Sequence, residues 1–225
     1  MKIVFWNCNY GFQKKYSKLD EISADLYIVA ECRDINNDKF TTFRETHKNI
    51  MYLKQDGDIK GLLIYSNKDK FTKQDWNDYN MDYYLPICFQ DKKILCVWTK
   101  HGYIEDLCTY TQLHMNDLKD TIIIGDFNSS VIWDKKHGRR THSFFNHLMN
   151  GVNHISAYHT QTGEQFGKET QPTFFLHRNE LQPYHIDYSY VPENDGYHLE
   201  IGNRDFLDYS DHLPLILDIN NDLKD

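Results

Sequence analysis

The sequence predicts an α/β protein of the α+β kind, in which two β-sheets pack together and helices lie outside them. Three observations lead to this fold class. Short runs rich in β-branched and aromatic residues recur from end to end of the chain, whereas segments with helical spacing are few. No Pro/Ser-rich linker or sequence repeat divides the 225 residues. A chain of this length can fill one continuous core, so we expect a single domain over residues 1–225.

The expected elements follow one another along the whole chain. Tyr16, Leu19 and Ile22 recur at a spacing of three and indicate a first helix. A third helix is expected from Thr141 to Met149. The second helix is predicted from one apolar face, formed by Ile104, Leu107, Cys108, Thr111 and Met115. The predicted strands are the runs at 2–8, 26–32, 61–66, 83–89, 93–99, 121–127, 172–177, 185–191, 197–201 and 213–219.

Composition and the chain start favour a cytoplasmic protein. Hydrophobic residues make up 40% of the chain, which is enough for packed layers, but no run has the length of a membrane span. Ile3 begins an apolar run directly after the start, which leaves no room for the regions of a signal peptide. The five cysteines are odd in number and lack C-x-x-C spacing, so we expect reduced core thiols.

The charge balance limits the kinds of partner. The formal net charge is -8, which disfavours a protein that holds nucleic acid over its whole surface, because such binding depends on Lys and Arg. A nuclease is still compatible with this charge, because carboxylates can bind a metal that meets the phosphate. The sequence lacks P-loop, G-x-G-x-x-G and G-x-S-x-G patterns, so no nucleotide cofactor is expected.

Polar residues of catalytically useful types stand at the ends of several predicted strands. Rigid strand ends are where scaffolds present catalytic groups. Each residue also has an ordinary explanation, because Gly, Asp and Asn are common where a strand leaves the core through a turn. The residues concerned are Asn7, Glu31, Asp126 and Asn128 at strand ends and Asp211 with His212 before the last strand.

Five motifs occur in order across nearly the whole chain. They are Trp6-Asn7, Ala30-Glu31-Cys32, Gly125-Asp126-Phe127-Asn128, His185-Ile186-Asp187-Tyr188 and Ser210-Asp211-His212. Together they resemble the endonuclease/exonuclease/phosphatase superfamily, the fold of pancreatic deoxyribonuclease and exonuclease III. The resemblance implies a four-layer αββα sandwich with two central, mainly antiparallel sheets. It also implies a hydrolase that depends on a divalent metal and cuts phosphodiester bonds.

The residues also suit a magnesium site on chemical grounds. Mg²⁺ prefers hard oxygen ligands and keeps several waters, so one or two carboxylates and an amide oxygen suffice. Glu31 is the first expected ligand. The resemblance implies that Asn7 and Asp211 support it, directly or through water. Mn²⁺ is a potential substitute for Mg²⁺.

Hydrolysis also needs an activated water and compensation of charge on the phosphoryl group. Asp126 is the candidate base. The resemblance implies that Asn128 holds the water or a phosphate oxygen in line. It further implies that His212 donates to a non-bridging oxygen while Asp187 accepts from the other ring nitrogen. Loss of Asp187 should therefore be milder than loss of His212.

Two positions depart from the family pattern. Many relatives carry a second catalytic histidine after the strand at 93–99, where this chain has Lys100, with His101 one residue later. A shift of one residue points a strand side chain elsewhere. Lys100 is therefore a candidate phosphate contact, with an ordinary surface lysine as the alternative. His185 stands where relatives often carry Arg, and we expect it to alter phosphate contacts or the local pH response.

Further residues are candidates for binding the substrate. Trp133, Arg139 and Arg140 belong to the densest basic stretch, which follows the proposed catalytic strand and is expected at the rim of a cleft. The alternative is a solvated loop. Arg33 would extend the same positive rim. Phe174 is a candidate for stacking on a base or filling an abasic gap, with core packing as the alternative.

The sequence leaves three functions open. The leading hypothesis is an endonuclease or exonuclease that cuts DNA or RNA, with a monomer as the default state. The second keeps the chemistry but acts on a phosphoinositide, sphingomyelin or small phosphoester; the net charge of -8 favours it slightly, although no lipid-docking helix is found. The third is a catalytically silent binding module, which the full set of expected ligands disfavours.

Overall fold

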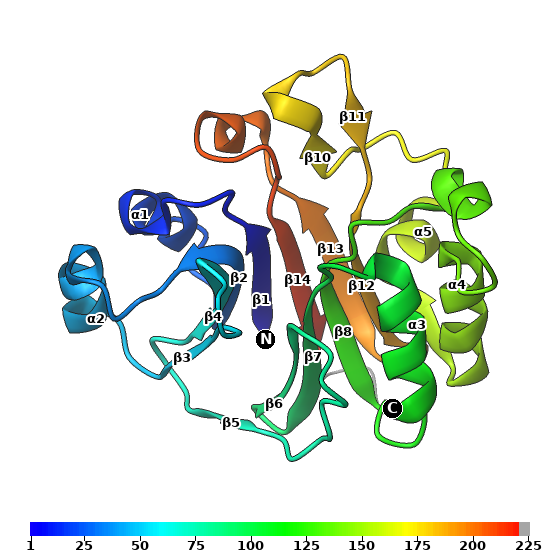
Figure 1. Ribbon diagram of the computed structural model, residues 1–225, viewed down its shortest axis with the longest axis horizontal. Helices are drawn as coiled ribbons and strands as arrows, with labels where there is room; N and C mark the ends of the chain where they lie inside the picture. The colour runs from blue at the N-terminus through cyan, green and yellow to red at the C-terminus, as the bar shows by residue number, and fades with distance from the viewer. Residues whose placement is uncertain (221–225) are drawn as a thin grey trace.

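Two six-stranded sheets pack face to face in the computed structural model, which describes residues 1–220 (Figure 1). The last five residues of the expected domain 1–225 lie outside the described residues. The first sheet contains, in spatial order, β13 (Gly196–Ile201), β14 (Leu215–Asn220), β1 (Lys2–Asn7), β2 (Leu26–Arg33), β4 (Lys60–Tyr65) and β3 (Ile50–Leu53). The second contains β5 (Phe71–Lys73), β6 (Tyr84–Phe89), β7 (Lys92–Trp98), β8 (Thr121–Asp126), β12 (Asp187–Pro192) and β9 (His154–Ser156).

Helices lie beside both sheets. Figure 1 shows α1 (Tyr16–Asp20) and α2 (Thr41–Thr46) beside the first sheet, and α3 (Tyr103–Leu113), α4 (His142–Gly151) and α5 (Ala157–Thr162) beside the second. Helices α1 to α4 pack on the outer faces of the sheets, whereas α5 contacts both β12 and β13 and contributes Ala157 and Tyr158 to the core between the sheets. Each sheet has one parallel pair, β1 with β2 and β7 with β8, and its other described pairs are antiparallel. The fold class expected from the sequence, an α/β sandwich with two mainly antiparallel sheets, is confirmed.

The central strands bury both of their faces. Along β1, Ile3 and Phe5 point into the core between the sheets, whereas Val4 and Trp6 point toward the helices outside. Ile124 of β8 faces the same inter-sheet core, and its neighbour Ile123 faces α3 and α4. Because strand side chains alternate with a period of two, a strand buried on both faces must be apolar throughout. The continuous apolar runs of the sequence follow from this arrangement.

The predicted strands coincide with observed strands to within two residues at either end, except for 172–177. That run contains only β10 (Phe174–Phe175), which pairs with β11 (Pro183–Tyr184). The sequence did not predict β3, β5 or β9, and all three are edge strands. An edge strand is covered on fewer sides, so its hydrophobic pattern is weaker.

The three predicted helices are present, with ends displaced by up to two residues. Thr141 caps α4 by accepting a hydrogen bond from the backbone N–H of Phe144 at 3.1 Å, and Met115 lies beyond the end of α3. The short helices α2 and α5 were not predicted. The remaining turns are 3₁₀ helices: η1 (Phe12–Lys14), η2 (Asp38–Phe40), η3 (Val131–Lys136), η4 (Leu176–Arg178) and η5 (Arg204–Asp208).

No helix within residues 1–220 combines the length and the apolar character that a membrane crossing requires.

The strand directions bring the polar ends of four strands to one edge of the sandwich. β1 and β8 end there with Asn7 and Asp126, and the antiparallel strand β12 begins there with Asp187. β14 is antiparallel to β1, so His212, just before β14, lies at the same edge. The side chain of Asn7 reaches across from the first sheet to Asp126 of the second, with 2.9 Å between Asn7 Nδ2 and Asp126 Oδ2.

Candidate active site

Two carboxylates lie opposite each other on adjacent strands of the second sheet. The antiparallel register of β8 and β12 pairs Asp126 with Asp187, and both side chains are fully buried. Burial, followed by the charge of Asp187, raises the pKa of Asp126 to about 7. Three hydrogen bonds to Asp126 offset part of this cost: Asn7 Nδ2 donates at 2.9 Å, the backbone N–H of Asn128 at 2.8 Å and Asn128 Nδ2 at 3.2 Å.

Gly125 allows β8 to approach β7 closely. A Cβ atom at this position would lie 1.9 Å from the carbonyl oxygen of Val97, so any side chain would force the strands apart. Gly125 is therefore an interior strand residue and not a turn residue, and Asp126 is the last residue of β8. Only Asn128 has turn-like backbone, with φ of 46°.

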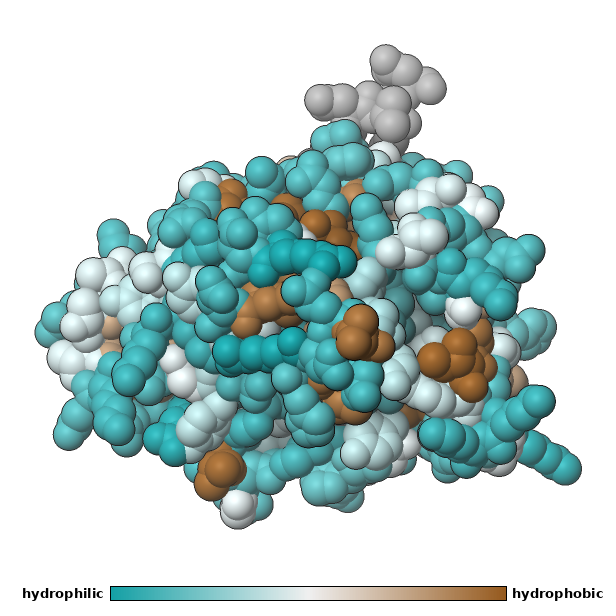
Figure 2. Space-filling model, turned by 90° about the horizontal axis from the view of Figure 1, so that it is seen from above, coloured by the Kyte–Doolittle hydropathy of each residue, from teal (hydrophilic) through white to brown (hydrophobic). Residues whose placement is uncertain are grey.

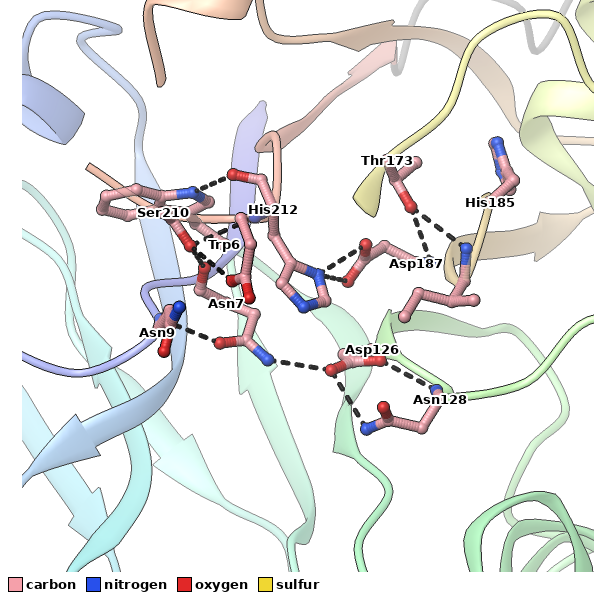
Figure 3. A network of polar contacts seen from close by, with 12 residues as sticks. Trp6, Asn7, Asn9, Asp126, Asn128, Thr173, His185, Asp187, Ser210 and His212 are labelled. Atoms are coloured by element: carbon pink, nitrogen blue, oxygen red, sulfur yellow. Dashed lines mark hydrogen bonds and ion pairs between the residues drawn. The ribbon is translucent and has the colours of Figure 1, made fainter. Parts of the chain in front are cut away.

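His212 and Asp187 form a buried pair (Figure 3). His212 Nδ1 lies 2.9 Å from Asp187 Oδ2 and 3.2 Å from Oδ1. Burial alone would favour the neutral imidazole, but the charge and hydrogen bond of Asp187 outweigh it and raise the pKa of His212 to about 9. The indole N–H of Trp6 donates to the His212 carbonyl at 2.9 Å and holds the backbone in place. His212 is therefore an oriented imidazolium near neutral pH.

Asn7 connects the two sheets at this site (Figure 3). Its amide nitrogen donates to Asp126 and lies 3.4 Å from Glu31 Oε1, while its oxygen accepts from the backbone N–H of Asn9 at 3.0 Å. The hydroxyl of Ser210 donates to the Asn7 carbonyl at 2.7 Å. These contacts fix the rotamer of Asn7 and the orientation of its amide.

Glu31 occupies a strained position on the first sheet. The register between β2 and β4 shifts between Val29 and Cys32, which lie opposite Leu63 and Gly61. One extra residue on β2 therefore makes a β-bulge, and Glu31 within it has φ of 59°. A left-handed backbone is unfavourable for a side chain of this kind, and such strain concentrates at functional sites.

A pocket of about 350 Å³, called the central pocket below, opens beside these residues. It contains two ion pairs, Glu31 with Lys60 and Asp58 with Lys100. The hydroxyl of Tyr83 also donates to Asp58. The lining residues include Glu31, Asp58, Lys60, Trp98, Lys100 and Asn128.

Two sets of side chains are candidates for holding a metal. Asp126, Asp187 and His212 offer ligand atoms within 4.8 Å of one another. However, a His212 that is protonated near neutral pH has no lone pair for a metal. Glu31 lies at the pocket surface, and its carboxylate is a hard oxygen donor that suits Mg²⁺ or Mn²⁺. The neighbouring Asn7 amide turns its nitrogen toward Glu31, while its oxygen accepts from the backbone N–H of Asn9. The donor set around Glu31 fits a hard divalent cation better than the set around His212 does.

Asp211, the third residue expected at the metal, lies at the edge of this group. Its Oδ1 is 3.4 Å from the hydroxyl of Ser210, and its carbonyl accepts from the backbone N–H of Phe175 at 2.8 Å. Within residues 1–220, no direct hydrogen bond joins the Asp211 side chain to Asn7 or Glu31. Ser210 connects Asp211 to Asn7 indirectly.

Aromatic side chains extend from His212 on the side of the η3 segment. The ring of Phe174 lies 4.6 Å from that of His212, between ring centroids, and 6.3 Å from Tyr184. Trp133 lies 5.2 Å from Tyr184, and Lys136 Nζ is 5.9 Å from the Trp133 ring. Phe174, Tyr184 and Trp133, called the aromatic row below, are all partly exposed. Two of the candidate substrate residues, Phe174 and Trp133, thus belong to one surface.

The other expected substrate residues are dispersed. Arg33 lies over the Tyr10 ring at 3.9 Å and lines a second pocket that shares Asp58 with the central pocket. Arg139 and Arg140 are exposed and line a separate pocket of about 330 Å³ beside α3 and α4. The structure therefore does not bring these two arginines together with the central pocket.

His185 is also separate from the central pocket. It is buried, and its Nδ1 lies 2.8 Å from the carbonyl oxygen of Gln171. Burial lowers the pKa of His185. Figure 3 shows the side chain pointing away from Asp126 and His212.

Sequence reasoning missed three residues next to the site: Lys60, Asp58 and Tyr184. Lys60 directly precedes the run predicted as strand 61–66, so a cation at that strand end was the available signal. Asp58 lies in the loop before it, and Tyr184 directly precedes the His185 motif. Their roles depend on the register of β4 and β11, which the sequence pattern does not determine.

Solved structures similar to this chain share its fold over almost the full length. A 3′-5′ exonuclease from Neisseria meningitidis matches with a TM-score of 0.70 at 15% identity, over 98% of this chain and 100% of that chain. A Neisseria 3′ phosphatase bound to product DNA hairpin matches with a TM-score of 0.72 at 15% identity, over 98% of this chain and 99% of that chain. An AP endonuclease from Archaeoglobus fulgidus matches with a TM-score of 0.69 at 16% identity, over 98% of this chain and 99% of that chain.

A scan against protein-family models finds no match, and a search of curated proteins also finds none. The solved structures therefore provide the comparison. At 15–16% identity they confirm the expected fold, an α/β sandwich of two mainly antiparallel sheets.

Proposed function

We propose that this protein is a divalent-metal-dependent phosphodiesterase that hydrolyses phosphodiester bonds in nucleic acid, DNA or RNA, with DNA as the first substrate to test. One observation carries the proposal. The Asp126 carboxylate and the His212–Asp187 pair meet at the edge of the sandwich where Asn7 also contacts Glu31 of the central pocket. A base, an oriented cationic donor and hard oxygen ligands are the groups that phosphodiester hydrolysis requires.

Asp126 acts as the general base for the attacking water. A pKa of about 7 lets the carboxylate accept a proton near neutral pH, whereas an ordinary aspartate is too weak a base. Asn7 and Asn128 hold both carboxylate oxygens from fixed positions. The base therefore needs little reorganisation when the water loses its proton.

Asn128 positions the water or a phosphate oxygen. Its Nδ2 donates to the carbonyl of Thr99 at 2.9 Å, which fixes the amide plane. That bond leaves the amide Oδ1 as the acceptor for the water. Such positioning removes part of the entropic barrier to attack.

His212 stabilises the charge that develops on the phosphoryl group. Asp187 occupies Nδ1, so the imidazolium donates from Nε2 to a non-bridging oxygen. Asp187 keeps His212 protonated and holds its ring orientation. Asp187 is a positioning residue, and its loss should cost less than that of His212.

Glu31 would hold Mg²⁺, with Asn7 and Asp211 in support, and Mn²⁺ is expected to substitute. When bound, the ion supplies positive charge to the phosphate and lowers the pKa of a coordinated water.

The aromatic row favours nucleic acid over a lipid or small phosphoester. Phe174, Tyr184 and Trp133 present ring surfaces next to His212, and aromatic rings bind bases by stacking, at about 1–3 kcal/mol for each base. Seen from above, the face that carries β10 and β11 is mostly hydrophilic, with hydrophobic residues in small separate groups (Figure 2). This surface does not suit insertion into a membrane.

The structural neighbours support DNA as the polymer. One of them is described as bound to product DNA hairpin. Arg33 and Lys100 are proposed phosphate contacts at the pocket. Arg139 and Arg140 would reach only a nucleic acid that extends past α3 and α4.

A panel of labelled substrates tests the proposal. Single- and double-stranded DNA, RNA and an abasic duplex would be incubated with Mg²⁺, Mn²⁺ or chelator, with Glu31→Gln and His212→Ala as controls. We expect metal-dependent cutting that both substitutions reduce strongly at low metal concentration. If folded protein cuts no nucleic acid but turns over soluble phosphoesters, the phosphoester hypothesis replaces this one.

A further inference from the structure

The Glu31–Lys60 ion pair lies where the metal ligand is expected. Lys60 Nζ contacts Glu31 Oε2, and both side chains line the central pocket, with exposed fractions of 29% and 22% for Lys60 and Glu31. Oε1 of Glu31 instead faces the buried amide of Asn7 at 3.4 Å. The pocket-facing oxygen of the proposed ligand is therefore already bound by a cation of the protein itself.

The backbone fixes this contact. The bulge in β2 restores its register at Cys32 and Arg33, opposite Gly61 and Lys60, so Lys60 begins β4 directly beside the bulge. Gly61 packs tightly, because a Cβ atom there would lie 2.3 Å from the carbonyl oxygen of Leu53. The backbones of both residues are therefore held in the sheet, and only the partly exposed Lys60 side chain is free to move away from Glu31. The pairing of Lys60 with Glu31 thus follows from the same bulge that strains Glu31.

Lys100 provides a contrast within the same pocket. Its ammonium group pairs with Asp58, which also accepts a hydrogen bond from Tyr83. Asp58 is not an expected metal ligand, so Lys100 can keep its partner when a metal binds. A metal bound to Glu31 weakens the Lys60–Glu31 ion pair, because a divalent cation and an ammonium group repel each other at the same carboxylate.

We propose that Lys60 is the counter-ion of Glu31 when no metal is bound. A divalent metal displaces the Lys60 ammonium group from Glu31, and this group then binds the substrate phosphate. This rests on the proposed function, because it takes Glu31 as the ligand and a phosphoester as the substrate. It makes metal binding and phosphate binding mutually supportive through one side chain. By linkage, the factor by which bound phosphate raises the affinity for metal must equal the factor by which bound metal raises the affinity for phosphate.

Mn²⁺ binding to the intact protein, without turnover, tests the inference. Free Mn²⁺ would be measured by electron paramagnetic resonance, with and without deoxyadenosine 5′-monophosphate, for wild type, Lys60→Met and Lys100→Met. Without nucleotide, Lys60→Met should bind Mn²⁺ about fivefold more tightly, the factor for the ~1 kcal/mol of a partly exposed ion pair. Lys100→Met makes the same charge change in the same pocket and should shift the affinity less.

The nucleotide arm separates displacement from simple repulsion. The nucleotide should tighten Mn²⁺ binding by a larger factor in wild type than in Lys60→Met, because the metal–phosphate contact remains in both and only wild type also releases Lys60 to the phosphate. Lys60→Arg should restore the larger factor. If Lys60→Met is poorly folded by circular dichroism, Lys60→Gln takes its place.

Two results would overturn the inference: Mn²⁺ affinity unchanged in Lys60→Met, or an equal nucleotide effect in all variants. Either result leaves nuclease activity untouched as a separate question. Conversely, a wild-type protein that binds Mn²⁺ through Glu31 but cuts no nucleic acid contradicts the proposed function, and the Lys60 measurement still stands.

Discussion

The two halves of the site are built in opposite ways. On the second sheet, Asp126 and Asp187 lie opposite each other in a regular ladder and are fully buried. On the first sheet, Glu31 lies in a bulge with a left-handed backbone and lines an open pocket, where Lys60 pairs with it. The first half is closed and regular, and the second is open and strained.

The difference corresponds to what each half has to do. Burial raises the pKa of Asp126, and the buried Asp187 carboxylate raises the pKa of His212 against the opposing effect of burial, so both pKa values lie in the direction that the proposed roles require. Glu31 has to exchange one cation for another, so it must be reached from solvent. A bulge turns its side chain out of the sheet alternation without breaking the strand.

The largest effect is expected from the closed half. His212→Ala should lower kcat by about 10²–10⁴-fold, because the oriented donor to the phosphoryl oxygen is lost. Asp187→Asn should lower it less. Steady-state rates on a labelled DNA duplex measure both, and an equal loss would show that Asp187 does more than orient His212.

The same variants sharpen the comparison through pH. Asp126 must be unprotonated, so kcat/KM should rise as pH increases through about 7. His212 must be protonated, so kcat/KM should fall as pH increases through about 9. In Asp187→Asn the basic limb should move to lower pH, because the carboxylate that raises the pKa of His212 is gone. A basic limb that stays in place would contradict the assigned pairing.

The regular ladder can be broken at Gly125. Gly125→Ala places a Cβ atom against the carbonyl oxygen of Val97 and should lower the free energy of unfolding by about 3 kcal/mol. Gly138→Ala is the matched control, because a Cβ atom there meets no other atom within 4 Å. Urea denaturation of both variants measures the difference, and equal stabilities would contradict the close approach of β7 and β8.

The central strands were predictable because they are buried on both faces. β1 and β8 read as unbroken apolar runs, and the order of Asn7, Glu31, Asp126 and His212 identified the fold before any geometry was known. Burial of a strand leaves a strong signal in composition, and a polar residue at its end stands out against it.

The open half was only partly predictable, since it depends on register. Glu31 was named from the sequence as a candidate ligand, but the bulge and its partner Lys60 were not predicted, because a single extra residue in β2 leaves no mark in the sequence. The expectation that Arg139 and Arg140 lie at the cleft assumed a loop direction. That direction is set by the packing of η3 against α4, which residue types do not encode.

The strain of the open half should appear as a stability difference at Glu31. Glu31→Gly and Glu31→Ala both remove the carboxylate and the ion pair, but only glycine adopts φ of 59° without steric cost. The glycine variant should be more stable by about 1 kcal/mol. Thermal or urea unfolding decides it, and a more stable alanine variant would show that the bulge is relaxed.

The smallest effect is expected outside both halves. Arg139→Ala with Arg140→Ala should change kcat/KM on a short oligonucleotide by less than about twofold, because both residues line a separate pocket.

Phe174→Ala should raise KM about tenfold by removing a stacking surface next to His212. If the double arginine variant and Phe174→Ala weaken activity on a short oligonucleotide equally, Arg139 and Arg140 contact the substrate near His212 and their assignment to a separate pocket is wrong.

A Mn²⁺ titration of DNA cleavage tests the division of labour most directly. The assay would compare wild type, Glu31→Gln and Asp126→Asn. We predict that wild type saturates at low Mn²⁺, that Glu31→Gln recovers part of its activity at high Mn²⁺, and that Asp126→Asn stays inactive throughout. Cleavage that persists in chelator, or an Asp126→Asn variant rescued by Mn²⁺ as Glu31→Gln is, would contradict the account.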